Sequence, residues 1–236
     1  MTSIRLTIFN IYNYKEEKMF KTETHLHTSE SSICGKSSAR ELMKIYHEAG
    51  YKTVFVSDHM HNKTMKHLGD IPWEEKVTIF FYGYYRAKKI GEELGMNVLP
   101  AAEITIKPNH YLAYNISREF LLEYPDIFHL SLEELSAAAK RHGVFLVQAH
   151  PHRNGKCFPT PEYVDGMEIY NSSPTNNDYS EKSEAVAREH GLYVTAGSDT
   201  HSPESAARTG LLSENEIKTV EDFIELVKSG KAQIIR

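Results

Sequence analysis

The stretch that decides the fold runs from Gly143 to His150 and reads GVFLVQAH. Its glycine ends a helix-like segment, as expected for a residue that tolerates the left-handed position after a helix. The apolar and β-branched residues that follow are typical of a buried strand in a parallel sheet. A helix, a glycine and a buried strand that ends in a polar side chain therefore make up one unit.

The same unit recurs along the chain. Gly50, Gly95, Gly143 and Gly191 follow one another at intervals of 45, 48 and 48 residues. The runs after the other three glycines are TVFVSDH (53–59), VLPAAE (98–103) and LYVTAGSD (192–199). Further strand candidates are KTETHLH (21–27), HYLAYNI (110–116) and DGMEIYN (165–171). About seven strands that alternate with helices predict an α/β protein.

The ends of these strands favour a barrel. His59, Glu103, His150 and Asp199 come seven to nine residues after their glycines, which places them at the carboxyl ends of strands. In a β/α barrel these ends meet at one rim, where active sites are built. We therefore expect a closed or nearly closed barrel. A doubly wound open sheet, which also has its site at strand ends, is the alternative.

Composition narrows the class of protein. The 236 residues are 40% hydrophobic and 25% charged, as in an ordinary folded protein, and contain no apolar run of transmembrane length. The formal net charge of −5 disfavours a surface for long nucleic acid. Two cysteines and a start that does not resemble a secretion signal predict a cytoplasmic protein. We expect a single domain over residues 19–236 and a disordered or loosely packed arm over 1–18, with Met19 as a candidate true start.

Histidine is the unusual residue, since the chain has 13 of them. Seven candidate metal ligands lie at predicted strand ends: His25, His27, His59, Glu103, His150, Asp199 and His201. Residues two apart on a strand face the same side, so His25 and His27 can reach one ion. Imidazoles and carboxylates together suit zinc, manganese or iron. Seven side chains exceed the needs of one ion, and Glu103 is the candidate bridge between two.

The motifs HLHT (25–28), SDH (57–59), a strand-borne Glu103, AHPHR (149–153) and GSDTH (197–201) occur in this order. The series resembles that of the PHP (polymerase and histidinol phosphatase) family of metal-dependent phosphoesterases, over about residues 20–212. The resemblance implies a distorted TIM-like (β/α)7 barrel, two or three divalent ions at its carboxyl-end rim, and hydrolysis of phosphate esters.

The resemblance also implies a role for each matching position. The implied metal ligands are His25, His27, His59, Glu103, His110, His150, Asp199 and His201. Among these, Glu103, Asp199 and His201 are the implied catalytic residues. Family members often place a further Asp or His after the first motif, where this chain has TSESSICG (28–35). Glu30 or Cys34 would have to serve there, and a small buried cysteine is the alternative for Cys34.

Three residues after the third motif are candidates for binding substrate: His152, Arg153 and Lys156. A guanidinium can hold a phosphate through two parallel hydrogen bonds, although a structural salt bridge is the alternative for Arg153. Glu168 and Asn171 end another strand and are candidates to orient the metal ligands.

These observations predict a phosphomonoesterase in which a metal-activated hydroxide attacks a small phosphorylated substrate. One alternative is a phosphodiesterase or exonuclease that acts on nucleotides or short oligonucleotides. The other is a non-catalytic metal-binding regulatory module. No membrane partner is expected, and the residues leave the substrate, the metal and the oligomeric state open.

Overall fold

The computed structural model describes residues 19–174 and 180–236, so the arm expected over 1–18 lies outside the described residues. The strands are β1 (Phe20–Glu23), β2 (Tyr51–Val56), β3 (His59–Met60), β4 (Asn97–Ile106), β5 (Asn109–Tyr114), β6 (Phe145–Ala149), β7 (Gly166–Asn171), β8 (Tyr193–Gly197), β9 (Gly210–Ser213) and β10 (Gln233–Ile235). The helices are α1 (Ala39–Glu48), α2 (Asn62–His67), α3 (Trp73–Phe80), α4 (Tyr82–Leu94), α5 (Arg118–Glu123), α6 (Leu132–Arg141), α7 (Ser180–Glu189) and α8 (Val220–Ser229).

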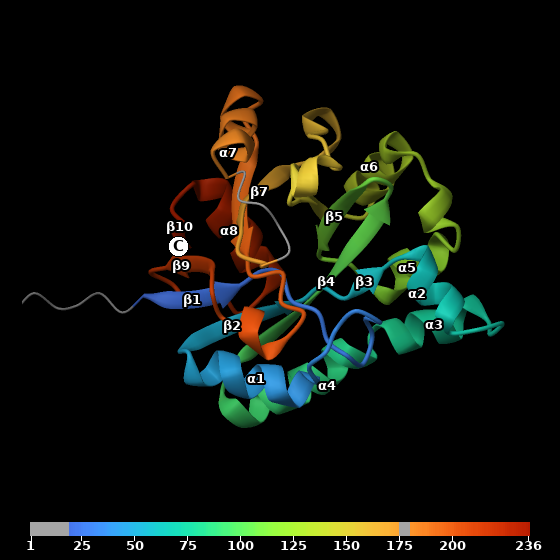
Figure 1. Cartoon of the computed structure of the whole chain (residues 1–236), viewed down its shortest axis with the longest axis horizontal. Coiled ribbons are helices and arrows are strands. Elements are labelled where there is room, and N and C mark those ends of the chain that lie inside the picture. The colour runs from blue at the N-terminus through green and yellow to red at the C-terminus, as the bar shows by residue number, and fades with distance from the viewer. Residues whose placement is uncertain (1–18, 175–179) are drawn as a thin grey trace, which may run out of the picture.

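The strands form one curved sheet in the order β10-β9-β1-β2-β4-β5-β6-β7-β8, with β3 paired to β4. The sheet closes on itself just beyond β1 and β8, where Leu26 and Thr200 form a parallel bridge. There the His27 N–H donates to the Thr200 carbonyl (3.0 Å) and the Thr200 N–H donates to the His25 carbonyl (3.3 Å). Seven strands, β1, β2 and β4 to β8, therefore enclose a nearly closed barrel, as the sequence predicts, with α1 and α4 side by side on its outside (Figure 1).

One strand departs from the expected repeat of helix and parallel strand. β5 runs antiparallel to both β4 and β6 and follows β4 through a tight hairpin, without a helix between them. An apolar pattern shows that a segment is a strand but not its direction, so the sequence could not reveal this. The reversal places His110, at the start of β5, opposite Thr105 and Ala149, which lie near the carboxyl ends of β4 and β6.

Local sequence signals set the ends of the helices. Ser131 caps α6 by accepting the Glu134 N–H, and the Glu134 side chain accepts the Ser131 N–H in return. At α1, Ser38 accepts the Glu41 N–H, while Glu30 from the preceding loop accepts the Ala39 N–H. The four glycines of the repeat have φ values of 64° to 78°, the left-handed region in which glycine carries no Cβ penalty.

The core lies mainly between the sheet and its helices. Leu42 and Met43 of α1, Val54 of β2 and Ile90 of α4 belong to one buried cluster. Phe223 of α8 packs against rings of β2 and β5 in another cluster. Over residues 19–174 and 180–236, no helix is both long and apolar enough to cross a membrane.

Candidate metal centre

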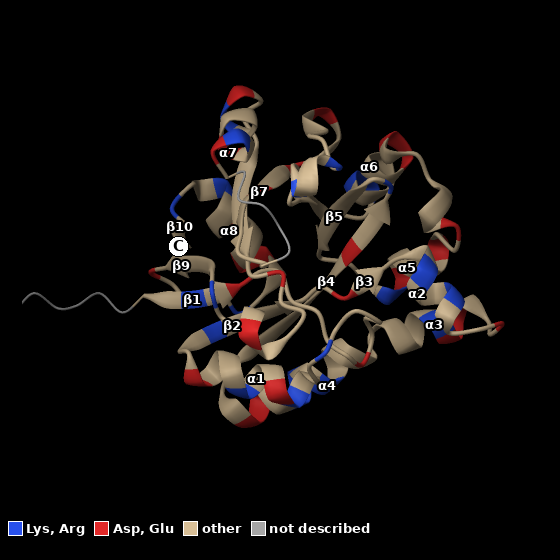
Figure 2. Ribbon diagram, viewed as in Figure 1, with Lys and Arg blue, Asp and Glu red and all other residues tan. Residues whose placement is uncertain are grey.

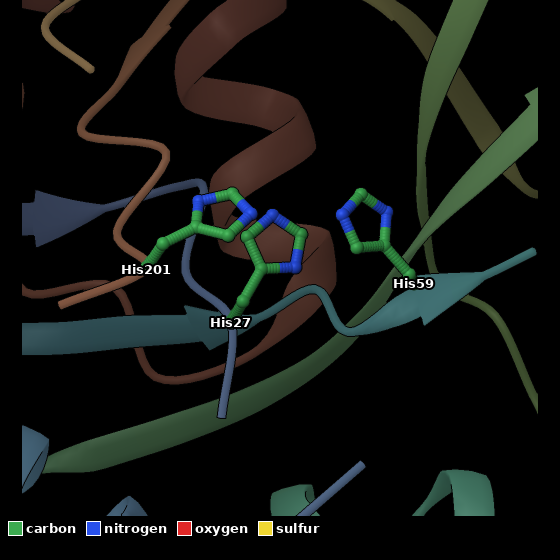
Figure 3. A group of neighbouring side chains, drawn as sticks. All are labelled: His27, His59 and His201. Atoms are coloured by element: carbon green, nitrogen blue, oxygen red, sulfur yellow. The ribbon is translucent and has the colours of Figure 1, made fainter. Parts of the chain in front are cut away.

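The structure brings all eight predicted ligand residues to the same rim of the barrel. His25 and His27 follow β1, His59 opens β3, Glu103 lies in β4, His110 lies in β5, His150 follows β6, and Asp199 and His201 follow β8. Figure 3 shows the rings of His27, His59 and His201 gathered from three separate segments. The eight side chains form four overlapping groups, and within each group the ligand atoms lie within 4.8 Å of one another.

Glu103 occupies the middle of this cluster and is fully buried. Its Oε2 lies 2.7 Å from His59 Nδ1, 3.4 Å from His27 Nε2 and 3.7 Å from His25 Nε2. Its Oε1 lies 3.0 Å from His150 Nε2 and 3.3 Å from His110 Nδ1. One carboxylate therefore faces five imidazoles, as expected of a group that bridges ions.

Asp199 supplies the second carboxylate. Its Oδ1 lies 3.2 to 3.5 Å from ring nitrogens of His25, His27 and His201. Asp199 has a φ of 49° and His150 a φ of 28°, a region that side chains rarely adopt. His150 directly follows β6 and Asp199 comes two residues after β8, and both side chains contribute to the cluster. Such strain persists only where the surroundings enforce it, and it is typical of functional sites.

The buried donor atoms fit a metal centre. Nε2 of His25, both ring nitrogens of His27 and Oε2 of Glu103 are buried without a hydrogen-bond partner. A buried polar group without a partner costs about 1–3 kcal/mol, so several together indicate a missing ligand. Divalent cations satisfy such lone pairs. The mixture of imidazole nitrogen and carboxylate oxygen fits zinc, manganese or iron better than calcium.

The pKa values of Glu103 and His59 reflect the attraction between the buried carboxylate and the imidazoles around it. Burial alone would raise the pKa of Glu103, but the imidazoles of His59 and His110 hold it well below its usual range. Burial alone would lower the pKa of His59, and the Glu103 carboxylate instead raises it to about 10. Cations that bind here must therefore displace protons from the rings, because only a neutral imidazole is a ligand.

Glu168 orients two of the ligands. It accepts hydrogen bonds from His25 Nδ1 (2.9 Å), the His150 backbone N–H (2.9 Å) and Asn171 Nδ2 (2.8 Å). The bond to Nδ1 leaves Nε2 of His25 directed at the cluster. Glu168 and Asn171 thus lie where the sequence analysis places groups that orient ligands, and such partners fix the tautomer and angle of a metal-binding histidine.

Glu23 is a positioning residue that the sequence analysis missed. Its Oε1 accepts the backbone N–H groups of Thr24, His25 and Ser198, each at 2.9 Å. Its Oε2 accepts the Tyr46 hydroxyl at 2.6 Å. The carboxylate therefore joins β1 to the segment after β8 and fixes the backbone of His25. The available signal was a glutamate two residues before His25 in a strand that is otherwise largely buried.

Asp58 was also missed, although it precedes His59 in the SDH motif. It accepts the N–H and the hydroxyl of Thr28 and the hydroxyl of Ser32, all at 2.7 Å. Ser32 Oγ in turn accepts the His59 N–H at 2.9 Å. A Cβ at Gly83 would collide with Thr28 Oγ1 and lie 2.6 Å from an Asp58 oxygen, so helix α4 needs glycine there. This network holds the loop that leads to Cys34.

Of the two candidates for a further ligand, the structure brings one to the cluster. Cys34 lies beside His59 and His201; burial would raise the pKa of its thiol, but these imidazoles lower it to about 6. Glu30 instead caps α1 through the Ala39 N–H. Metal ligation by Cys34 remains a prediction that these positions favour.

A cavity of about 470 Å³ opens over the cluster. Cys34, His59, His110 and His201 line it on the side of the ligands. Two of the three predicted substrate residues, Arg153 and Lys156, also line it, whereas His152 does not. Neighbouring residues in a turn point in different directions, so their closeness in sequence could not separate them. Burial and the nearby Lys182 lower the pKa of His152.

The chain is similar to known proteins in both sequence and structure. Residues 177–232, which include α7, β8, β9 and α8, match the family model described as PHP-associated. No curated protein matches the chain by sequence. A solved two-domain protein from Bacteroides vulgatus that contains a predicted PHP-like metal-dependent phosphoesterase has a TM-score of 0.70 and 16% identity. The similarity covers 92% of this chain but only 64% of that protein.

Two further structures share the architecture. A candidate metal-dependent phosphoesterase from Bifidobacterium adolescentis has a TM-score of 0.55 and 19% identity, covering 89% of this chain and 96% of that one. A lesion-specific endonuclease from Pyrococcus furiosus has a TM-score of 0.62 and 16% identity, covering 92% of this chain and 58% of that one. These likenesses confirm the resemblance that the ordered motifs predict, and the chain therefore has the PHP fold.

Proposed function

We propose that this protein is a metal-dependent hydrolase of small phosphate monoesters. The observation that carries the proposal is the buried Glu103 carboxylate, which faces five imidazoles at the floor of a cavity lined by Arg153 and Lys156. Such a site can hold two or three cations and still admit a phosphate. Zinc, manganese and iron are the proposed metals, because the ligands are imidazoles and carboxylates with at most one thiolate.

The residues of the proposed active site have separate roles. When bound, divalent cations supply positive charge that offsets the charge of a phosphate and makes water more acidic. Glu103 and Asp199, which both face Nε2 of His25 and of His27, would hold the cations together with these rings. Arg153 binds and orients the phosphate oxygens from the cavity wall. The His201 ring donates from Nδ1 to the Asp199 carbonyl (2.9 Å), so its Nε2 remains available as a ligand or proton acceptor.

The proposal is tested by phosphate release from a panel of small phosphomonoesters and nucleotides. Protein stripped with a chelator is reconstituted separately with manganese, zinc and iron. We expect metal-dependent release that is strongest for one compound. Asp199→Asn should fold, lose bound metal and abolish turnover. Full metal content and activity in this variant, or silence across the panel from metal-loaded wild type, would overturn the assignment.

Cleavage of short oligonucleotides is the second candidate, and the shared fold with the Pyrococcus endonuclease favours testing it. The net charge of −5 argues against many phosphate contacts. Any nuclease activity should therefore show a shallow dependence on salt concentration. For the compartment we propose the cytoplasm, because both Cys34 and Cys157 are free cysteines.

A further inference from the structure

A second cavity of about 500 Å³ adjoins the one over the metal centre, and His61 and Lys63 line both. We call it the lysine cavity, because Lys63, Lys66 and Lys107 line it together with His61, His129 and Phe128. From these features we infer that the substrate carries a second phosphate group, bound in the lysine cavity while the first lies at the metal centre. This inference rests on the proposed phosphatase function and specifies its substrate class.

The charge of the lysine cavity supports an anionic occupant. None of its lining residues, all of which lie in the described part of the chain, is an aspartate or glutamate. Among the described residues, no ion pair joins Lys63, Lys66 or Lys107 to a carboxylate. Three exposed ammonium groups that line one hollow without a carboxylate make it locally positive in a protein with a net charge of −5, which favours an anionic occupant.

The walls of the lysine cavity are built on the strands that carry the metal ligands. Lys107 lies in the turn of the β4–β5 hairpin, four residues after Glu103 and three before His110. At the rise of a strand, Lys107 and Glu103 are separated by about 13 Å. Lys63 and Lys66 lie three residues apart on α2, which begins three residues after His59 of β3. Figure 2 shows blue lysine or arginine segments on the ribbon beside the α2 label.

A molecule that spans both cavities would contact the metal centre at one end and the lysine-lined surface at the other. Lys63 and Lys66 line the lysine cavity from α2, and Lys107 lines it from the β4–β5 hairpin. Because the two cavities share His61 and Lys63, one small molecule could place a phosphate in each. Phe128 and Ile106 add apolar surface for the carbon skeleton between the phosphates. Ammonium groups bind phosphate as point charges, so they select for charge more than for the shape of the skeleton.

The test compares glucose 1,6-bisphosphate with glucose 6-phosphate on the full chain loaded with manganese. We expect wild type to prefer the bisphosphate. In the double variant Lys66→Ala/Lys107→Ala, the ratio of the two kcat/KM values should fall by about fivefold, mainly through KM. Lys89→Ala removes an exposed lysine of α4 and should leave the ratio unchanged. An equal ratio in wild type and double variant would overturn the inference.

A second pair of compounds identifies the source of the second phosphate. Thymidine 5′-monophosphate is compared with the 5′-phosphorylated dinucleotide pTpT, whose second phosphate is a diester. A lysine-dependent preference for pTpT without one for the sugar bisphosphate would contradict the small bisphosphate and favour an oligonucleotide.

Binding separates this inference from the proposed function. The affinity of glucose 1,6-bisphosphate for metal-stripped protein is measured at low and high salt by calorimetry. We expect binding that weakens with salt and with loss of the two lysines. If no compound is hydrolysed but this binding persists, the phosphatase proposal fails while the anion site stands. If the compounds are hydrolysed but loss of the two lysines changes neither turnover nor binding, the phosphatase proposal stands and the inference about the lysine cavity fails.

Discussion

Two glutamates in this barrel are equally buried and yet have opposite surroundings. Glu23 and Glu103 both have 0% of their surface exposed, and both lie on strands next to the metal centre. Glu23 accepts hydrogen bonds from three backbone N–H groups and one tyrosine hydroxyl. Glu103 has an oxygen without a hydrogen-bond partner and is surrounded by imidazole rings. Burial of a carboxylate therefore does not reveal its role, whereas the atoms that face it do.

The pKa values of the two groups diverge for the same reason. Burial raises the pKa of Glu23, because its neighbours are neutral donors. At Glu103 burial acts in the same direction, but the nearby histidines outweigh it and lower the pKa. The hydrogen bonds around Glu23 form a satisfied structural network, whereas the candidate metal centre around Glu103 contains buried nitrogen and oxygen atoms without hydrogen-bond partners. Substitutions at these two sites should therefore affect different properties.

The largest effect is expected for Glu103→Gln. The amide keeps the size of the side chain but removes the charge that holds two cations, so hydrolysis should fall by at least about a thousandfold. The metal-stripped variant should stay folded, because the neighbouring imidazoles can become neutral once the carboxylate charge is gone. Phosphate release, metal content and urea unfolding are measured together. A stable, fully metal-loaded and active variant would remove Glu103 from the centre.

Glu23→Ala should produce the reverse pattern. Three backbone N–H groups and the Tyr46 hydroxyl would lose their acceptor in a buried site, which should cost about 3–5 kcal/mol of unfolding free energy. The matched control is Glu23→Gln, whose oxygen can still accept the N–H groups and whose amide can donate to Tyr46. Urea unfolding in chelator measures both variants. Equal stability of Glu23→Ala and wild type would contradict the structural role of this carboxylate.

That the candidate ligands would meet at one rim could be predicted from sequence, because the signal is local. The apolar run after each of the four repeat glycines ends in a histidine or carboxylate, and the geometry of a barrel brings strand ends together regardless of the loops. His110 was expected only through family resemblance, since it opens a strand. Its place at the rim depends on the reversed direction of β5, which an apolar pattern does not encode.

The supporting residues could not be predicted in the same way. Glu23 is one polar residue in a strand, and its partners Tyr46 and Ser198 are distant in sequence. Asp58 acts through Thr28 and Ser32, which belong to a loop that precedes α1. These contacts depend on how the loops pack, and nothing in their spacing indicates it. Sequence thus identifies the atoms that meet a metal ion more readily than the hydrogen bonds that hold them.

Glu168→Gln should weaken the metal centre without removing a ligand from it. With its amide oxygen in the place of Oε2, the variant keeps the bonds from the His150 N–H and Asn171 Nδ2 but loses the charged acceptor that aligns His25 through Nδ1. Metal affinity should therefore fall by about 10- to 100-fold. Competition with a coloured chelator measures the loss, and Asn171→Ala, which removes only one bond to Glu168, should show a smaller one. An affinity equal to that of wild type would mean that packing alone orients His25.

The smallest effect is the response of the metal-stripped protein to pH. Burial would lower the pKa of His59 and His150, but the Glu103 carboxylate raises that of His59 to about 10, and Cys157 together with Glu103 raises that of His150 to about 9. Because these folded-state values exceed the unfolded value near 6.5, the native chain binds more protons between pH 7 and 9, and the stability it gains is lost as pH rises. Cys34 opposes this trend, since its thiol has a folded-state pKa of about 6.

Because histidines outnumber that single thiol, the unfolding free energy should fall by about 1 kcal/mol per pH unit over this range. Urea unfolding in chelator measures the slope, and Glu103→Gln should flatten it by removing the charge that raises the pKa of His59. Metal binding at pH 7.5 should release protons, which calorimetry detects in buffers of different ionisation enthalpy. A flat stability profile together with no proton release would mean that the rings around Glu103 are already neutral, which would make its surroundings resemble those of Glu23.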